Sequence, residues 1–282
     1  MRPTLRARRA LFALALASIG AGSVSAETPL ERGRYLARSI SACGNCHTEQ
    51  GPKGPVAGKE LAGTFMGEDA LGKIWSANIT PDKATGIGRW TDAQIATLIR
   101  EGRRPDGTLI GPMMPMGQYR GISDRDLAAL VAYVRSVKPV KNQVPKPEYK
   151  IPLPPNYGPP VGSVPEVARS DKVAWGRYLA GPLGHCIECH SAPDKTGAPD
   201  TVNQLGAGGL TFDGPWGRSI AANITPTNLQ RYSDAELKKI ITTGLRPDGS
   251  RLKPPMGVAY YAHINAADLD ALVAYLRTLP RK

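Results

Sequence analysis

Cysteine and histidine are scarce in this chain, which has four of each among 282 residues. All four cysteines and two of the histidines lie in two Cys-x-x-Cys-His pentapeptides, Cys43–His47 and Cys186–His190. No cysteine is therefore spare for a separate role elsewhere. None follows closely on the apolar run near the N-terminus, which argues against a lipid-modified N-terminus.

Aromatic residues are also scarce, at 6% of the chain, whereas 31 glycines and 26 prolines are present. No alternation of apolar and polar residues is long enough to predict a β-sheet. We therefore expect a mostly α-helical protein whose short helices are separated by Gly/Pro-rich loops.

The spacing of the two pentapeptides is that of covalent haem attachment. Two thiols separated by two residues reach one porphyrin and form thioether bonds, and the histidine that follows turns beneath the iron as its proximal ligand. The predicted attachment residues are Cys43, Cys46, Cys186 and Cys189, and the predicted proximal ligands are His47 and His190. The sequence thus predicts two covalently bound haem c groups, whose apolar bodies would stabilise loop-rich domains by burial.

Two other interpretations of a Cys-x-x-Cys pair are a zinc site and a dithiol redox pair. The four thiolates could together form a closed zinc site, or one of the two histidines could replace one of the sulfur ligands. Neither interpretation explains a histidine at the same offset in both copies, which favours haem.

The N-terminus has the composition of an export signal. Four arginines precede an apolar run at residues 10–17, and the small residues Val24, Ser25 and Ala26 precede Glu27. The run is too short for a comfortable membrane span, so we expect a signal peptide over residues 1–26, with an uncleaved anchor as the alternative. The exported chain would lie in a bacterial periplasm, which fits covalent haem attachment.

The chain is basic, with a formal net charge of +12, and loss of the four signal arginines would leave +8. The haem carboxylates would lower this value further. A basic balance usually suggests a nucleic-acid or membrane-surface partner, but the positive charges form no dense cluster, and export and haem binding argue against nucleic acid. We expect the net positive charge to give moderate electrostatic attraction toward an acidic protein partner.

The chain is a tandem duplication with offsets of 142 to 145 residues. The repeated segments are Gly33–Ala37 and Gly176–Ala180, Ala77–Pro81 and Ala222–Pro226, Arg104–Gly107 and Arg246–Gly249, and Leu130–Tyr133 and Leu272–Tyr275. These repeats predict one domain over residues 27–138 and a second over 171–282. The proline-rich stretch 139–170 is the predicted linker, and its apolar Ile151, Leu153 and Tyr157 lead us to expect that it packs along the domains.

Helix signals occur at matching places in the two halves. Thr91 and Ser233 each begin a capping box ahead of apolar residues at helical spacing. The last helix of each half is expected to start at Ser123 and Asn265, and each carries an apolar stripe with a period of 3.6 residues.

Together these motifs make each half similar to the class I cytochrome c family, and the resemblance covers nearly the whole exported chain. It implies two tandem cytochrome c-like domains, each with a few helices and Gly/Pro-rich loops around one covalent haem. A C-terminal helix would cross the helix that leads into the haem motif, closely at Gly33 and Gly176, with Tyr133 and Tyr275 against the crossing. A methionine from a proline-rich loop would bind the iron on the distal side.

The repeat indicates which methionines these are. The second half offers only Met256, seven residues after the glycine of Arg-Pro-Asp-Gly, and the same offset in the first half selects Met114. The separations from the proximal histidines then agree, at 67 and 66 residues. Met113 and Met116 are the alternatives, since matching the two Pro-Met-Gly triplets would select Met116.

Other residues are candidates for the haem pockets, with ordinary packing as the alternative for each. They are Trp75, Asn78, Trp90, Trp216 and Asn223. The two remaining histidines, His185 and His263, are expected at the surface rather than on iron.

Ligation by histidine and methionine fills both axial positions of the iron and raises its reduction potential. We therefore expect a periplasmic di-haem electron carrier, not an enzyme, that passes single electrons between a dehydrogenase and a cytochrome or oxidase acceptor. The Asn-Ile-Thr-Pro and Arg-Pro-Asp-Gly repeats resemble those of cytochrome subunits of membrane-bound dehydrogenases, although such subunits often carry three haem motifs. Membrane association would come through a partner or an uncleaved signal.

The alternative function is a di-haem peroxidase or another di-haem redox enzyme. A peroxidase needs one iron with an open or displaceable site, which a methionine in both halves argues against. A thiosulfate-oxidising di-haem enzyme would use a cysteine as distal ligand, and this chain has none to spare.

Overall fold

The computed structural model describes residues 26–51 and 54–282. The predicted signal peptide, up to residue 25, lies outside the described residues. Helices make up 35% of the described residues, and three small antiparallel sheets accompany them in these ranges. No helix in the described part of the chain is long and apolar enough to cross a membrane.

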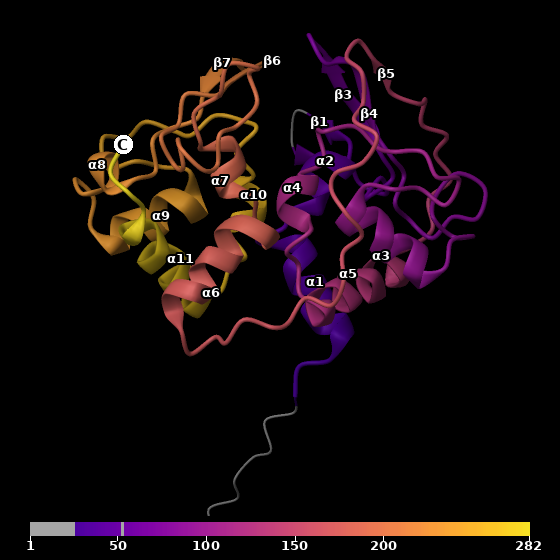
Figure 1. Cartoon of the computed structure of the whole chain (residues 1–282), viewed down its shortest axis with the longest axis horizontal. Coiled ribbons are helices and arrows are strands. Elements are labelled where there is room, and N and C mark those ends of the chain that lie inside the picture. Colours follow the sequence, from indigo (N-terminus) through magenta and orange to yellow (C-terminus); the bar gives the residue numbers. More distant parts are fainter. Residues whose placement is uncertain (1–25, 52–53) are drawn as a thin grey trace, which may run out of the picture.

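The chain forms two lobes that lie side by side (Figure 1), and the second repeats the helix order of the first with η1 and α8 added. The helices of the first lobe are α1 (Pro29–Arg38), α2 (Cys43–His47), α3 (Asp92–Glu101), α4 (Met116–Tyr119) and α5 (Asp124–Ser136). Those of the second are α6 (Lys172–Tyr178), the π-helical turn η1 (Leu179–Leu183), α7 (Cys186–Cys189), α8 (Pro226–Leu229), α9 (Asp234–Thr243), α10 (Val258–Tyr261) and α11 (Ala266–Thr278).

The first and last helices of each lobe cross closely, as the sequence predicted. A Cβ atom on Gly33 would lie 1.8 Å from the carbonyl oxygen of Ala129 in α5, and one on Gly176 would lie 2.0 Å from that of Ala271 in α11. Only glycine lets the backbones approach to this distance. Tyr133 and Tyr275 pack against the two crossings, also as predicted.

Side-chain caps fix where the helices begin. The predicted capping boxes at Thr91 and Ser233 are both formed, ahead of α3 and α9. Ser123 and Asn265 are the N-caps of α5 and α11. A third capping box, at Thr28 ahead of α1, was not predicted. Each cap satisfies backbone N–H groups that have no partner within the helix.

The expectation that the chain has no sheet was wrong. The strands are β1 (Gln50–Gly51), β2 (Gly54–Pro55), β3 (Thr64–Glu68), β4 (Gly72–Ser76), β5 (Glu148–Tyr149), β6 (Thr211–Gly214) and β7 (Gly217–Ile220). The β3–β4 register shifts between Phe65 and Gly67, which breaks the two-residue alternation that identifies a strand in a sequence. The β3–β4 and β6–β7 hairpins extend from the same end of the two lobes (Figure 1).

The proline-rich segment between the lobes packs along the first one, which confirms that expectation. Tyr149 Oη accepts a hydrogen bond from the backbone N–H of Gly111 (2.9 Å), and Tyr157 Oη donates one to the carbonyl of Ile110 (2.7 Å). The strand β5 extends the β3–β4 sheet. The linker therefore contacts the loop that carries the candidate distal methionine of the first half. The domain limits at residues 138 and 170 stay predictions.

Candidate haem sites

Each Cys-x-x-Cys-His motif forms a short helix entered through a left-handed residue. Ala42 (φ 44°) precedes α2, and His185 (φ 42°) precedes α7. One helical turn then places the two cysteines of a motif on the same face, three residues apart. All four cysteines are free of disulfide bonds, so each pair presents two thiols side by side.

The histidine that ends each motif is held by a backbone carbonyl. His47 Nδ1 donates a hydrogen bond to the carbonyl of Ala77 (2.8 Å), and His190 Nδ1 donates one to that of Ala222 (2.7 Å). A carbonyl only accepts, so the proton must be on Nδ1, which leaves Nε2 as the nitrogen available to a metal. Burial lowers the pKa of both imidazoles, and this keeps them in the neutral, ligating form.

The role of these carbonyls was not predicted from the sequence. Ala77 and Ala222 begin the repeated Ala-Asn-Ile-Thr-Pro segments. The repetition of this segment in both halves was the available signal. The repeated segment after each haem motif supplies the backbone carbonyl that accepts the hydrogen bond of the motif's histidine.

The thiols suit thioether formation better than thiolate chemistry. Burial raises the pKa of the Cys43 thiol to about 12 and that of Cys186 to about 11. Dithiol exchange needs the thiolate, which a raised pKa disfavours. Within the ranges 26–51 and 54–282, no group of three or more His, Cys, Asp or Glu side chains is placed to hold a metal ion. Paired thiols beside a neutral imidazole fit haem c.

The loops that carry Met114 and Met256 form the same backbone hydrogen bonds, although the Pro254–Pro255 peptide bond of the second loop is cis. The N–H of Met114 binds the carbonyl of Gly111 (3.4 Å), and the N–H of Met256 binds that of Lys253 (3.3 Å). The carbonyl of each methionine accepts from the residue two positions later, at 2.7 Å and 2.9 Å. Both side chains are half-buried against the hydrophobic core. The two residues are therefore structural equivalents.

Met116 occupies a different kind of position. It is the first residue of α4, is 1% exposed, and its Sδ lies against Gly102. Val258, the first residue of α10, lies against Gly244 in the same way. An ordinary apolar residue thus replaces Met116 in the second lobe, whereas Met113 is 48% exposed to solvent.

The predicted pocket asparagines stabilise loops. Asn78 Oδ1 accepts from the backbone and hydroxyl of Thr80, and its Nδ2 donates to the carbonyl of Val140. Asn223 makes the corresponding bonds to Thr225, and its Nδ2 donates to the carbonyl of Lys282. Both side chains tie the segment after the histidine-binding carbonyl to a later part of the chain.

The three predicted pocket tryptophans lie in different surroundings. Trp75 packs on Phe65 across the β3–β4 hairpin, with ring centroids 5.2 Å apart. Trp90 packs against the core ahead of α3. Trp216 is 38% exposed at the turn between β6 and β7. The three tryptophans therefore do not form a single cluster.

His185 is half-buried rather than fully at the surface. Its ring packs edge-on against Tyr119 of the first lobe, with centroids 6.0 Å apart, and burial lowers its pKa to about 4. The sequence could not show this because Tyr119 belongs to the other half of the chain. His263 is exposed, as expected.

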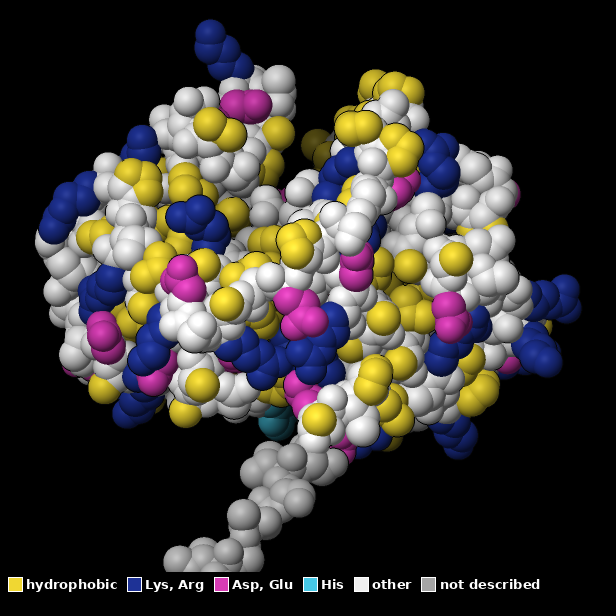
Figure 2. All heavy atoms as spheres, turned by 60° about the horizontal axis from the view of Figure 1, so that its bottom comes forward, with side chains coloured by type: hydrophobic (Ala, Val, Ile, Leu, Met, Phe, Trp, Pro, Cys, Tyr) yellow, Lys and Arg dark blue, Asp and Glu magenta, His cyan; other side chains and the backbone are white. Residues whose placement is uncertain are grey.

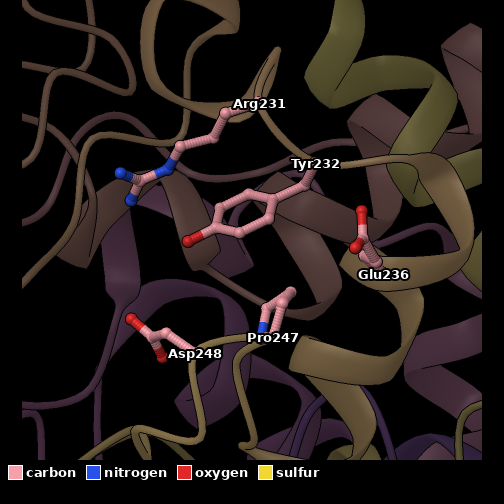
Figure 3. Close-up of a pocket in the computed structure, with 5 residues that line it drawn as sticks. All are labelled: Arg231, Tyr232, Glu236, Pro247 and Asp248. Carbon is pink, nitrogen blue, oxygen red and sulfur yellow. The ribbon is translucent and has the colours of Figure 1, made fainter.

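A cavity of about 240 Å³ lies on the second lobe and is lined by Arg231, Tyr232, Glu236, Pro247 and Asp248. The Tyr232 hydroxyl points toward the side of the cavity where Arg231 and Asp248 lie (Figure 3). The volume of the cavity is below the range of about 300–1,000 Å³ that is usual for ligand sites. None of its lining residues belongs to the haem motifs or the methionine loops.

Comparisons with known proteins agree with this geometry. The Cytochrome c family model matches residues 30–138 and 178–280. A nicotinate dehydrogenase subunit of Pseudomonas putida is 34% identical over 92% of this chain, and the fructose dehydrogenase cytochrome subunit of Gluconobacter japonicus is 32% identical over 92%. A diheme cytochrome c-type protein of Cereibacter sphaeroides is 27% identical over 84%.

The matched regions cover different shares of these relatives. They span 22% of the nicotinate dehydrogenase subunit and 54% of the fructose dehydrogenase subunit, but 82% of the diheme protein. The chain thus corresponds to part of the longer subunits and to most of the shorter one.

Two matching lobes, each with a thiol pair and an oriented histidine, define a tandem haem-binding protein. The chain belongs to the cytochrome c family and carries two covalently bound haem c groups.

Proposed function

We propose that this protein is a periplasmic di-haem cytochrome that passes single electrons between a dehydrogenase and a downstream cytochrome or oxidase. His47 and Met114 would hold one haem iron, and His190 and Met256 would hold the other. The observation that carries the proposal is the equivalence of the two methionine loops, because it pairs each oriented histidine with one methionine.

Bound haem c supplies one-electron redox chemistry at its iron. The Ala77 and Ala222 carbonyls hold the imidazoles in the ligating tautomer. The thioethers of Met114 and Met256 would supply the second protein ligand of each haem iron, which would disfavour binding of peroxide. The residues thus favour electron relay over catalysis on a substrate.

The relatives support a redox partner. Their names describe a dehydrogenase subunit and cytochrome subunits of fructose, alcohol and gluconate dehydrogenases. We infer that the donor is a dehydrogenase, that the haem domains span residues 27–138 and 171–282, and that the export signal over residues 1–26 directs the chain to the periplasm. Any membrane association comes through the partner or an uncleaved signal.

The charge distribution on one face of the molecule supports a protein partner there rather than nucleic acid. On the face shown in Figure 2, basic and acidic side chains are interspersed, and no continuous basic surface forms. A backbone-binding nucleic-acid site would gather lysine and arginine on one face.

Replacement of each methionine tests the ligand assignment. The oxidised protein should show the near-infrared sulfur-to-iron band for both haems. Met114→Ala and Met256→Ala should each abolish the band of one haem, because each removes one thioether ligand. The matched controls Met113→Ala and Met116→Leu should keep both bands, since the first side chain is exposed and the second is packing.

Two results would contradict the proposal. Loss of a band in Met116→Leu, with Met114→Ala unchanged, would transfer the ligand role to Met116. One high-spin haem in the unmodified protein would favour the di-haem peroxidase.

A further inference from the structure

Two tyrosines cross the seam between the lobes in a reciprocal arrangement. Tyr35 of α1 donates a hydrogen bond to Asp268 Oδ2 of α11 (2.6 Å) and accepts one from the N–H of Asn265 (3.2 Å). Tyr178 of α6 donates to Asp126 Oδ2 of α5 (2.9 Å) and accepts from the N–H of Ser123 (3.0 Å). Each first helix thus binds the N-terminus of the other lobe's last helix.

The carboxylates that receive these bonds are buried and held by their own lobes. Asp126 is 4% exposed and pairs with Arg32, 2.7 Å from Arg32 Nε. Asp268 is 3% exposed and accepts a hydrogen bond from Trp175 Nε1 (2.7 Å). Hydrogen bonds to buried charged groups are among the stronger ones in proteins. The tyrosines therefore contact two rigid, preformed acceptors.

The tyrosine hydroxyls remain donors across the whole working range. Burial raises the pKa of Tyr35 and of Tyr178, and the carboxylates of Asp268 and Asp126 raise them further. Both phenols are therefore protonated at every pH at which a cytochrome operates.

The same seam brings the haem motif of one lobe against the methionine loop of the other. Asn45, between Cys43 and Cys46, donates a hydrogen bond to the carbonyl of Pro255 (3.0 Å), the residue before Met256. Gly44 packs against Tyr260, since a Cβ there would lie 2.4 Å from its hydroxyl oxygen.

Contacts also form from the segment that leads into the other lobe's motif. The His185 ring packs on Tyr119, and η1 contacts α4. The Cys43–His47 motif and the segment just before Cys186 are thus both part of the interface.

We propose that Tyr35 and Tyr178 are positioning residues that lock the lobes together and fix the two haem sites at the separation needed for direct electron exchange. In that exchange one iron is oxidised as the other is reduced, and no bond forms or breaks. The inference rests on the proposed electron-transfer function, in which both haems lie on the electron's route.

Hydrogen exchange on the full-length holoprotein tests the lock. Tyr35→Phe and Tyr178→Phe should each speed amide exchange in residues 116–123 and 179–185, by about tenfold or more, because each removes a hydrogen bond to a charged group. Exchange at the α1–α5 and α6–α11 crossings should not change. Tyr133→Phe is the matched control: its hydroxyl bonds Glu60 within the first lobe (3.1 Å) and should leave the seam unaffected.

Electron exchange between the haems tests the positioning role. Tyr35→Glu sets a second carboxylate beside Asp268, and like charges at an interface repel. Tyr35 is half-buried, so a glutamate there can reach solvent as the seam opens. After reduction of one haem by a light pulse, this variant should equilibrate about tenfold or more slowly, while each haem keeps its near-infrared band.

Either of two results would overturn the proposal: unchanged exchange at the seam in both phenylalanine variants, or an unchanged inter-haem rate in Tyr35→Glu. Failure of the proposed function is distinct from both, because it would show as a missing sulfur-to-iron band in the unmodified protein.

Discussion

At the scale of single residues, two glycines decide whether each lobe can close. Gly33 and Gly176 lie where the first and last helices cross, and a side chain at either position would overlap a backbone carbonyl of the facing helix. Backbone atoms cannot move aside as a flexible side chain can, so the whole helix must shift. Glycine is therefore required at both positions by the fold itself.

Replacement of Gly33 by alanine should be strongly destabilising. The added Cβ would lie 1.8 Å from the Ala129 oxygen, and overpacking of this kind costs roughly 1–3 kcal/mol or more. Urea unfolding of the holoprotein measures the effect. Gly117→Ala is the matched control because no atom lies within 4 Å of a Cβ there. An equal stability of the two variants would contradict the argument.

His185 shows the limit of inference from single residues. Its sequence position beside Cys186 gave no sign of burial, and the group that buries it, Tyr119, lies in the other half of the chain. The environment of a side chain at a domain interface depends on both domains.

At the scale of elements, Asp124 joins the start of α5 to two other segments. It pairs with Arg100 of α3 (2.6 Å) and accepts hydrogen bonds from the hydroxyl of Ser163 (2.6 Å) and the N–H of Val164 (3.2 Å) in the linker. The hydrogen bond from Ser163, with those from Arg100 and Val164, lowers the pKa of Asp124 from 3.8 to about 2. The ionised form is therefore the one that holds the linker.

The contribution of Asp124 to stability should depend on pH. Because its pKa is lower in the folded chain, the stabilisation is complete above about pH 4 and is lost as the pH falls toward 2. The urea midpoints of the unmodified protein and Asp124→Asn should differ at pH 5 and converge near pH 2.

A surface pair supplies the control for this titration. Glu166 pairs with Arg125, and both side chains are about half exposed, so Glu166→Gln should shift the midpoint little at any pH. A constant difference between the unmodified protein and Asp124→Asn down to pH 2 would exclude the proposed role of Asp124.

The helices could be predicted from local sequence patterns, whereas the strands could not. Capping boxes and helical stripes depend on residues three or four positions apart, and they located α3, α5, α9 and α11 correctly. The sheets are different. β5 pairs with β4 from more than seventy residues away, and Gly72 permits that approach because a Cβ there would lie 2.0 Å from the Glu148 carbonyl. Such pairing leaves no local pattern.

At the scale of the whole molecule, charge should affect the rate of electron exchange. Loss of the four signal arginines would lower the formal net charge from +12 to +8, and the haem carboxylates would lower it further while leaving the protein basic. A net positive protein attracts anionic reagents at low ionic strength. Reduction by a small anionic reagent should be faster than by a cationic one of similar potential.

Stopped-flow measurements over a salt series would test this steering. The two rates should converge at an ionic strength near 1 M, where screening acts over about 3 Å. Faster reaction with the cationic reagent at low salt would show that local charge near the haems, rather than net charge, controls the approach.

The sequence by itself determined the chemistry and the duplication. Two Cys-x-x-Cys-His motifs specify covalent haem because attachment is local, within five residues, and the repeats predicted two similar lobes. The choice between Met114 and Met116 was open in the sequence, since both lie in one short loop. The backbone equivalence with Met256 and the packing of Met116 on Gly102 favour Met114.

Only the tertiary structure decided how the two halves meet. The bonds from Tyr35 to Asp268 and from Tyr178 to Asp126 join residues far apart in the chain, and each partner is an ordinary helix residue within its own half. A haem motif fixes its own cofactor through neighbouring atoms, whereas the separation of two cofactors depends on the packing of whole domains. That is why the attachment sites could be read from the sequence and their relation to each other could not.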